Sequence, residues 1–131
     1  MNMLLQPEGL AKPKGYANGI AATGRHVFVA GQIGWNAQCE LVARDFLGQF
    51  RQALQNVVAV LASAGAGPEH VTTMTWFITD KAGYLKEAKA VGQAWREIMG
   101  RNFPAMAVVQ VVALMEDAAL VEIQAQAVIP E

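Results

Sequence analysis

Glu122 is the residue whose chemical type and setting most directly suggest a reactive site. It lies in the run from Phe103 to Ala127, where the other side chains are mainly apolar or amide-bearing. A carboxylate in an apolar strand is usually paired or functional, because burying an unpaired charge is costly. Such a group can orient a water molecule and transfer its proton. The pattern alone leaves a second interpretation open, in which Glu122 is a solvent-facing charge on an edge strand.

Four other residues carry groups that could take part in chemistry. Tyr16 begins an apolar run after a glycine, and it is either a packing residue or a hydroxyl donor in a pocket. Cys39 has no base or cation nearby in the sequence to activate its thiol. His26 and His70 lack a metal-ligand spacing, and the sequence contains no GxxxxGK[ST], GxGxxG, HExxH or CxxC motif. We therefore expect no metal. We interpret Cys39 as an incidental thiol, His26 as a strand residue beside a turn, and His70 as a surface residue before a strand.

The hydrophobic pattern predicts an α+β domain that would position these residues. Apolar residues recur at three- and four-residue steps from Asp45, which is typical of an amphipathic helix. The expected strands are 16–23, 26–31, 71–79, 106–115 and 119–129, and the expected helices are 45–64 and 81–99. The order is therefore β-β-α-β-α-β-β, with both helices on one face of a mixed sheet. Residues 1–15 are predicted to be an irregular N-terminal arm of a single domain spanning residues 1–131.

Turn signals predict which strands pair. Gly24-Arg25 should join the first two strands in a hairpin, and Glu116-Asp117 should join the last two. In the last strand, alternation places Val121, Ile123 and the following odd-numbered residues on one face, and Glu122 on the other.

The composition limits the classes of partner. The chain has 131 residues, a net charge of -1, 16% charged residues and one cysteine. Nucleic-acid binding is disfavoured because no basic block is present, and no apolar run approaches the roughly 18 residues of a membrane span. The single cysteine and the lack of a secretory signal pattern favour a cytoplasmic protein. Typical chains carry about 25% charged residues, so the shortfall indicates that some surface is buried against another copy of the chain.

Several motifs, in order and across nearly the whole chain, resemble the Rid (YjgF) superfamily of reactive-intermediate deaminases. They are KGYANGI (14–20), VFVAGQIG (27–34), FRQALQNVVAVLASAGAG (50–67), VTTMTWFITD (71–80) and FPAMAVVQVVALMEDAALVEIQAQAV (103–128). The resemblance implies a chorismate-mutase-like fold and a homotrimer with pockets between subunits. It also implies hydrolysis of imines or enamines to a keto product and ammonia, without a cofactor.

The resemblance assigns roles to individual residues. Glu122, in VEIQA, matches the family's water-orienting carboxylate, and Tyr16 matches a pocket tyrosine. Gly31 and Gln32 form the GQ turn whose backbone lines the site. Substrate-binding positions are expected at Met106, Val108 and Trp95.

The sequence departs from the family at the substrate-gripping arginine. Typical deaminases carry Arg where PAMA places Met106. Loss of this charge should weaken the binding of a small anionic imino acid by about tenfold or more. Arg25, Arg44 or Arg101 could replace it from a loop or a neighbouring subunit. Many members also have Asn on the second helix where this chain has Gly92.

Three functions remain open from the sequence. The first is an imine or enamine deaminase with an atypical substrate, in which Glu122 and Tyr16 are catalytic. The alternative is a non-catalytic trimer that binds a small metabolite or a partner protein. A ribonuclease or translation inhibitor is a third reading, which the net charge of -1 argues against.

Overall fold

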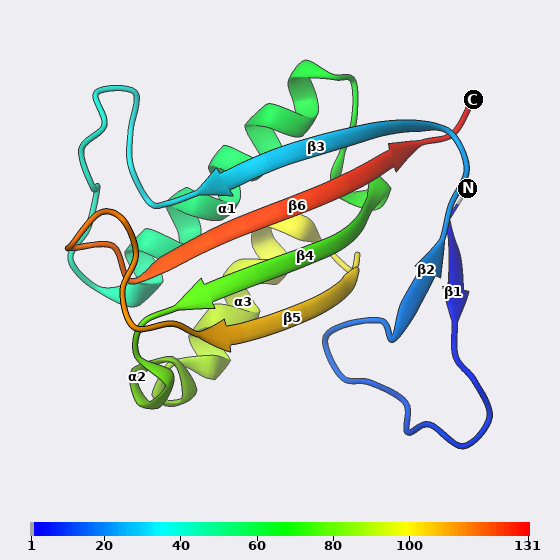
Figure 1. Ribbon diagram of the computed structural model, residues 1–131, viewed down its shortest axis with the longest axis horizontal. Coiled ribbons are helices and arrows are strands. Elements are labelled where there is room, and N and C mark those ends of the chain that lie inside the picture. The colour runs from blue at the N-terminus through cyan, green and yellow to red at the C-terminus, as the bar shows by residue number, and fades with distance from the viewer. Residues whose placement is uncertain (1) are drawn as a thin grey trace.

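A four-stranded mixed sheet organises the molecule, and the computed structural model describes residues 2–131. Its strands lie in the order β3 (Arg25–Gln32), β6 (Val121–Ile129), β4 (Val71–Ile78) and β5 (Ala105–Gln110) (Figure 1). Strand β6 is antiparallel to both of its neighbours, whereas β5 is parallel to β4. The predicted α+β class is therefore confirmed. No helix within residues 2–131 is long and apolar enough to cross a membrane.

Helix α1 (Phe46–Ser63) forms where the apolar periodicity predicts it. The Asp45 side chain caps its first turn by accepting a hydrogen bond from the Gly48 N–H at 3.3 Å. Phe50 and Leu54 of this helix are fully buried. After the helix, Gly65 adopts a φ of 78°, a left-handed conformation that glycine adopts without strain. A short 3-10 turn, η1 (Pro68–His70), then leads into β4.

The second predicted helix is divided into α2 (Lys81–Lys86) and α3 (Ala88–Met99). The Asp80 side chain caps α2 by accepting a hydrogen bond from the Gly83 N–H at 3.1 Å. At Glu87 the backbone leaves helical geometry, with φ -100° and ψ 10°. Leu85, near the end of α2, is 58% exposed. The spacing of apolar residues does not encode a one-residue break, which explains why this division was missed.

Neither predicted hairpin forms. Strand β2 (Gly19–Ala21) pairs with β1 (Met3–Leu5), and β3 pairs with β6. The N-terminal arm is thus not irregular throughout, because β1 lies within it. Strand β5 pairs with β4, and the parallel direction is possible because α2 and α3 form the crossover. Strand β6 lies between β3 and β4, where burial on the sheet outweighs the local turn signal.

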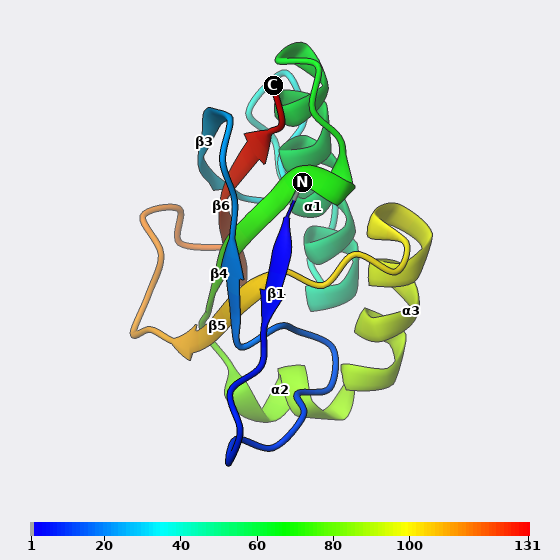
Figure 2. The ribbon, with the colours of Figure 1, turned by 90° about the vertical axis from the view of Figure 1, so that its right-hand side faces the viewer.

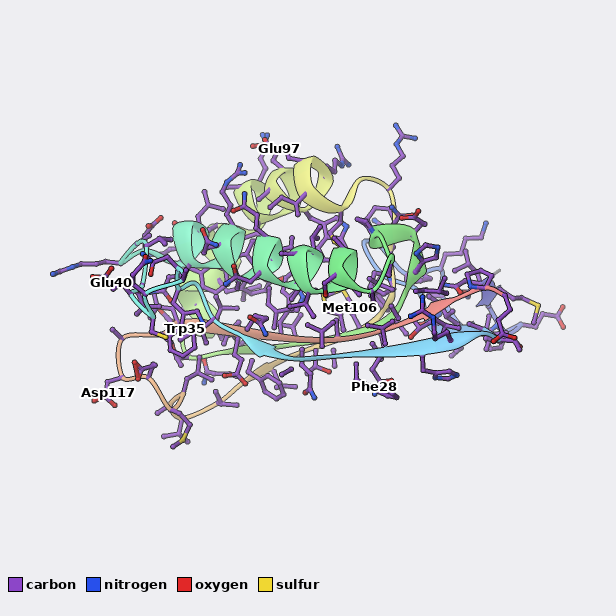
Figure 3. All side chains as sticks on the ribbon, turned by 90° about the horizontal axis from the view of Figure 1, so that it is seen from above. Phe28, Trp35, Glu40, Glu97, Met106 and Asp117 are labelled. Carbon is purple, nitrogen blue, oxygen red and sulfur yellow. The ribbon has the colours of Figure 1, made fainter. Side chains whose placement is uncertain are left out.

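The central sheet has one covered face and one uncovered face. Figure 2 shows α1 and α3 on the same side of the sheet, which we call the helix face, as predicted. Val121 and Ile123 are fully buried on that side. The opposite side, the open face, carries no helix. Phe28 is 69% exposed there and points away from the helices (Figure 3).

Gln49 is a fully buried polar side chain that ties two loops to α1. Its amide nitrogen donates to the backbone oxygens of Ala43 at 3.1 Å and Ala118 at 3.0 Å. Its amide oxygen accepts from the Leu120 N–H at 2.7 Å. These bonds satisfy the buried amide and fix the chain immediately before β6.

Candidate functional site

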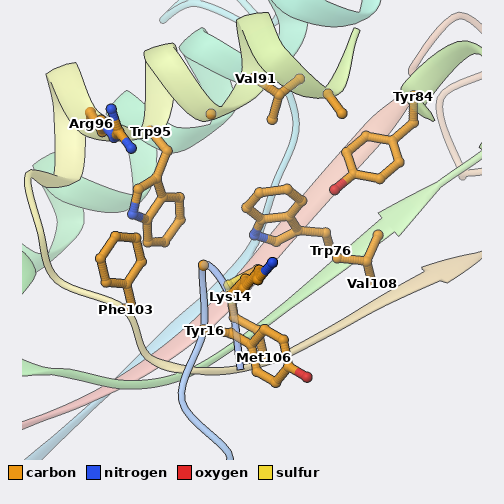
Figure 4. Close-up of a pocket in the computed structure, with 13 residues that line it drawn as sticks. Lys14, Tyr16, Trp76, Tyr84, Val91, Trp95, Arg96, Phe103, Met106 and Val108 are labelled. Carbon is orange, nitrogen blue, oxygen red and sulfur yellow. The ribbon is translucent and has the colours of Figure 1, made fainter. Parts of the chain in front are cut away.

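A pocket of about 470 Å³ opens on the helix face, between β5, α2, α3 and the end of the N-terminal arm (Figure 4). We call it the aromatic pocket. The aromatic and apolar side chains that line it include Tyr16, Trp76, Tyr84, Trp95, Phe103, Met106 and Val108. Four of the predicted site residues are therefore brought together here: Tyr16, Trp95, Met106 and Val108.

Interlocking aromatic rings form the walls of the aromatic pocket. The Trp76 and Trp95 ring centroids are 5.8 Å apart, and Trp95 stacks on Phe103 at 6.5 Å with 14° between their planes. The Trp95 Nε1–H donates to the Asn102 backbone oxygen at 3.2 Å, which holds the indole in place. Contacts of this kind favour offset and edge-on arrangements and make the walls rigid.

The register of β4 and β5 explains why Met106 and Val108 face this pocket. Met74 aligns with Met106, and Trp76 aligns with Val108, in the parallel pair. Aligned residues point to the same side of a sheet, and Met74 and Trp76 are buried toward the helices. An arginine at position 106 would therefore also extend into the pocket. Here the position supplies a thioether and no charge.

The polar groups of the pocket are donors and cations. Burial raises the pKa of the Tyr84 hydroxyl above its ordinary value, so this group stays protonated at neutral pH. The buried Trp76 Nε1–H has no hydrogen-bond partner within residues 2–131. Lys14 and Arg96 also line the pocket, whereas none of its lining residues is Asp or Glu.

Glu122 lies on the opposite face of the sheet from the aromatic pocket. It aligns with Phe77 in the β4–β6 pair, and Phe77 alternates with the inward-facing Trp76 and Ile78. Its side chain is half-buried beside Gly31 of β3, where a Cβ atom would fall only 2.7 Å from the Glu122 Cδ. Gln32 aligns with Ile123 after a bulge in β3, and its amide donates to the Ala30 backbone oxygen at 3.1 Å. Glu122 and Gly31 thus form a second group, separate from the pocket, whereas the alignment of Gln32 with the inward-facing Ile123 does not place its side chain beside Glu122.

None of the arginines proposed as replacements for the family arginine lines the aromatic pocket. Arg25 donates to the Ala64 backbone oxygen at 3.0 Å, and Arg44 is exposed just before α1. Arg101 lines a different cleft of about 480 Å³, between β1, β2 and the body of the domain. Within one chain, the cations near Met106 are instead Lys14 and Arg96. The sequence held a signal for Arg96, since it lies one helical turn after Gly92, on the same face of α3.

Cys39, His26 and His70 do not line the aromatic pocket. Cys39 is exposed in a loop. His26 stacks on Phe28 with ring centroids 6.2 Å apart, and the His70 Nδ1 accepts from the Gly67 N–H at 2.9 Å. Across residues 2–131, no group of three or more His, Cys, Asp and Glu side chains is arranged to hold a metal ion.

Comparison with known proteins places these features in a family. The family model described as Endoribonuclease L-PSP matches residues 8–129. The chain belongs to the Rid (YjgF) superfamily. A Rid protein of Yersinia pestis, YyfB, matches with a TM-score of 0.83 at 30% identity, over 98% of each chain.

Other relatives extend this Rid assignment. The RutC family protein UK114 of Drosophila melanogaster is 33% identical over 122 residues, which cover 92% of this chain and 85% of that protein. TdcF of Escherichia coli, named as a candidate reactive intermediate deaminase, is 32% identical over 116 residues, covering 86% of this chain and 85% of TdcF. A TdcF structure with bound serine matches with a TM-score of 0.69 at 30% identity, over 97% and 98% of the two chains.

Proposed function

We propose that this Rid-family chain is a hydrolytic deaminase of an imine or enamine metabolite, acting as a cytoplasmic homotrimer. Each site would combine the aromatic pocket of one subunit with Glu122 of its neighbour. The observation that carries this proposal is the placement of the two groups on opposite faces of one sheet. A carboxylate on the open face cannot reach the pocket of its own chain, but a second copy could present it there.

The proposed reaction needs a water molecule and groups that move protons. Glu122 accepts a proton from water as the oxygen attacks the carbon of the C=N bond. The nitrogen takes up that proton to give a neutral carbinolamine. As the carbinolamine collapses, its hydroxyl proton also passes to the nitrogen, the C–N bond breaks, and the products are ammonia and a carbonyl. Tyr16 donates a hydrogen bond to the substrate. The oxygen of water replaces the nitrogen on the substrate carbon, and the oxidation state of that carbon does not change. We therefore expect no cofactor.

The residue at position 106 should influence which imine the pocket binds. The usual arginine forms a charge-assisted pair with the substrate carboxylate, and hydrogen bonds of this type contribute about 1.5–3 kcal/mol. A methionine offers a soft, apolar surface instead. We therefore expect a substrate that differs from the small anionic imino acids of typical deaminases.

Mixed oligomers test the shared site directly. Glu122→Ala removes the carboxylate, and Gly92→Trp fills the aromatic pocket, since nothing lies within 4 Å of a Cβ at Gly92. Each variant alone should release no ammonia from freshly generated imines. Co-expressed variants with different tags should regain roughly a quarter of wild-type activity, because random assembly leaves about that fraction of sites intact.

The controls separate this arrangement from its alternatives. Purified mixed oligomers that stay inactive would exclude a site shared between subunits, provided that wild-type oligomers treated in the same way are active. Full activity of Glu122→Ala alone would remove the carboxylate from the mechanism. A ligand held intact, with no turnover of any imine by wild type, would favour the non-catalytic binding trimer, which the loss of the arginine at position 106 also supports.

A further inference from the structure

Two cations at the aromatic pocket have no hydrogen-bond or ion-pair partner among residues 2–131. Lys14 comes from the N-terminal arm and Arg96 from α3, and Figure 4 shows them on different sides of the pocket. The ion pair within residues 2–131 is Arg51–Glu97, at 2.7 Å, on the protein surface. Neither Lys14 nor Arg96 donates a side-chain hydrogen bond to another of the described residues. Both charges are therefore free to meet a ligand.

The charged side chains of the pocket favour a ligand with a negative charge. Its lining includes two cations and no carboxylate. A cleft lined by one sign of charge with apolar walls raises the local concentration of counter-ions. An anionic group is thus favoured, although position 106 supplies no charge to hold it.

The walls of the pocket select the body of the ligand. Trp76, Trp95 and Phe103 present large apolar ring surfaces. Gly92 leaves open space on the α3 side, because no atom lies within 4 Å of a Cβ built there. An aromatic group gains contact with such rings, whereas a group as small as a methyl would leave much of the pocket to water.

We infer that Lys14 and Arg96 bind the carboxylate of an aryl-bearing substrate, whose ring lies against Trp95 and Phe103. This inference rests on the proposed function for the reaction, but binding itself requires no turnover. The acid group would then be held by side chains of α3 and the N-terminal arm, and not by a side chain of β5. The loss of the arginine at position 106 thus accompanies a relocation of the anion-binding charges.

Calorimetric titration with stable ligands tests the inference on the intact protein. We expect 3-phenylpropanoate to bind about tenfold or more tightly than both its neutral amide and pyruvate. Arg96→Gln and Lys14→Gln should each weaken 3-phenylpropanoate by about tenfold and leave the amide unchanged. Lys89→Gln, at an exposed lysine of α3 that does not line the pocket, is the matched control and should bind like wild type.

A second variant addresses the ring. Phe103 is partly exposed, at 36%, so Phe103→Leu should fold and should weaken 3-phenylpropanoate more than pyruvate. Equal affinity for the acid and its amide, or no binding of 3-phenylpropanoate at millimolar concentration, would overturn the inference. These outcomes are independent of deamination. A protein that releases no ammonia but prefers the aryl acid would refute only the proposed function, and a deaminase indifferent to the aryl group would refute only this inference.

Discussion

The two faces of the central sheet contribute different halves of the candidate site. The helix face holds the aromatic pocket, whose walls are rigid rings and whose charges are Lys14 and Arg96. The open face holds Glu122 beside Gly31 and carries the exposed ring of Phe28. Under the proposed function, the helix face would bind the ligand and Glu122 of the open face would move a proton. The proposed reaction would then require two chains to assemble.

We expect the largest effect from removal of the carboxylate on the open face. Glu122→Gln keeps the shape of the side chain but removes its basicity, and general-base catalysis typically contributes about 10²–10⁴-fold. We expect kcat for ammonia release to fall by that factor, while the affinity for 3-phenylpropanoate stays unchanged. Glu116→Gln, in the exposed loop before β6, is the matched control. A comparable loss in the control variant would show that the effect is not specific to position 122.

Gly31→Ala should displace the same carboxylate without removing it. The added Cβ would fall 2.7 Å from the Glu122 Cδ, so the side chain must swing away. Misplacement of a catalytic group by about 1 Å can cost 10²-fold, and we expect kcat to drop by about 10- to 100-fold. In a Glu122→Gln background the same change should have no further effect. Additive losses would mean that Gly31 acts independently of Glu122.

Met106→Arg alters the other half of the site. The new guanidinium should enter the aromatic pocket from β5, because position 106 aligns with the inward-facing Met74. We expect kcat/KM on 2-aminoacrylate-type imines to rise by about tenfold, the value of one charge-assisted contact. The measurement is ammonia release from a freshly generated imine. A wild type that already matches a typical family deaminase on this substrate would contradict the argument from the missing arginine.

Tyr16→Phe should have the smallest effect. Tyr16 is 42% exposed at the mouth of the pocket, so removal of its hydroxyl should leave folding intact. One neutral hydrogen bond contributes about 0.5–1.5 kcal/mol, which corresponds to a roughly 2- to 10-fold fall in kcat/KM. Steady-state kinetics with unchanged thermal unfolding would support this role. An unchanged kcat/KM would make Tyr16 a packing residue, the alternative that the sequence left open.

The sequence predicted elements whose signals are local. The apolar steps of α1 and the alternation of β6 both appear where expected, within a few residues. Strand pairing was wrong at both hairpins, because pairing depends on burial between distant segments and not on a glycine or an acidic turn. The break at Glu87 was missed for a related reason, since it leaves the spacing of apolar residues almost unchanged.

The candidate site was predicted as a set of residues, but the arrangement of those residues was not. Motif resemblance gave Tyr16, Met106 and Glu122 together, and the fold places the last on the far side of the sheet from the first two. The free charges of Lys14 and Arg96 were missed, because their position beside Met106 depends on how the N-terminal arm and α3 approach β5. Only the three-dimensional register of β4, β5 and β6 separates the two groups.

The buried amide of Gln49 has a consequence for how this sequence can change over evolution. It holds Ala118 and Leu120 against α1, and Val112 and Met115 lie fully exposed in the preceding loop. An insertion or deletion in this loop should not shift β6, because the Gln49 hydrogen bonds hold the chain in place just before the strand begins. The loop is therefore free to vary in length among descendants of this gene, while Glu122 keeps its place on the strand.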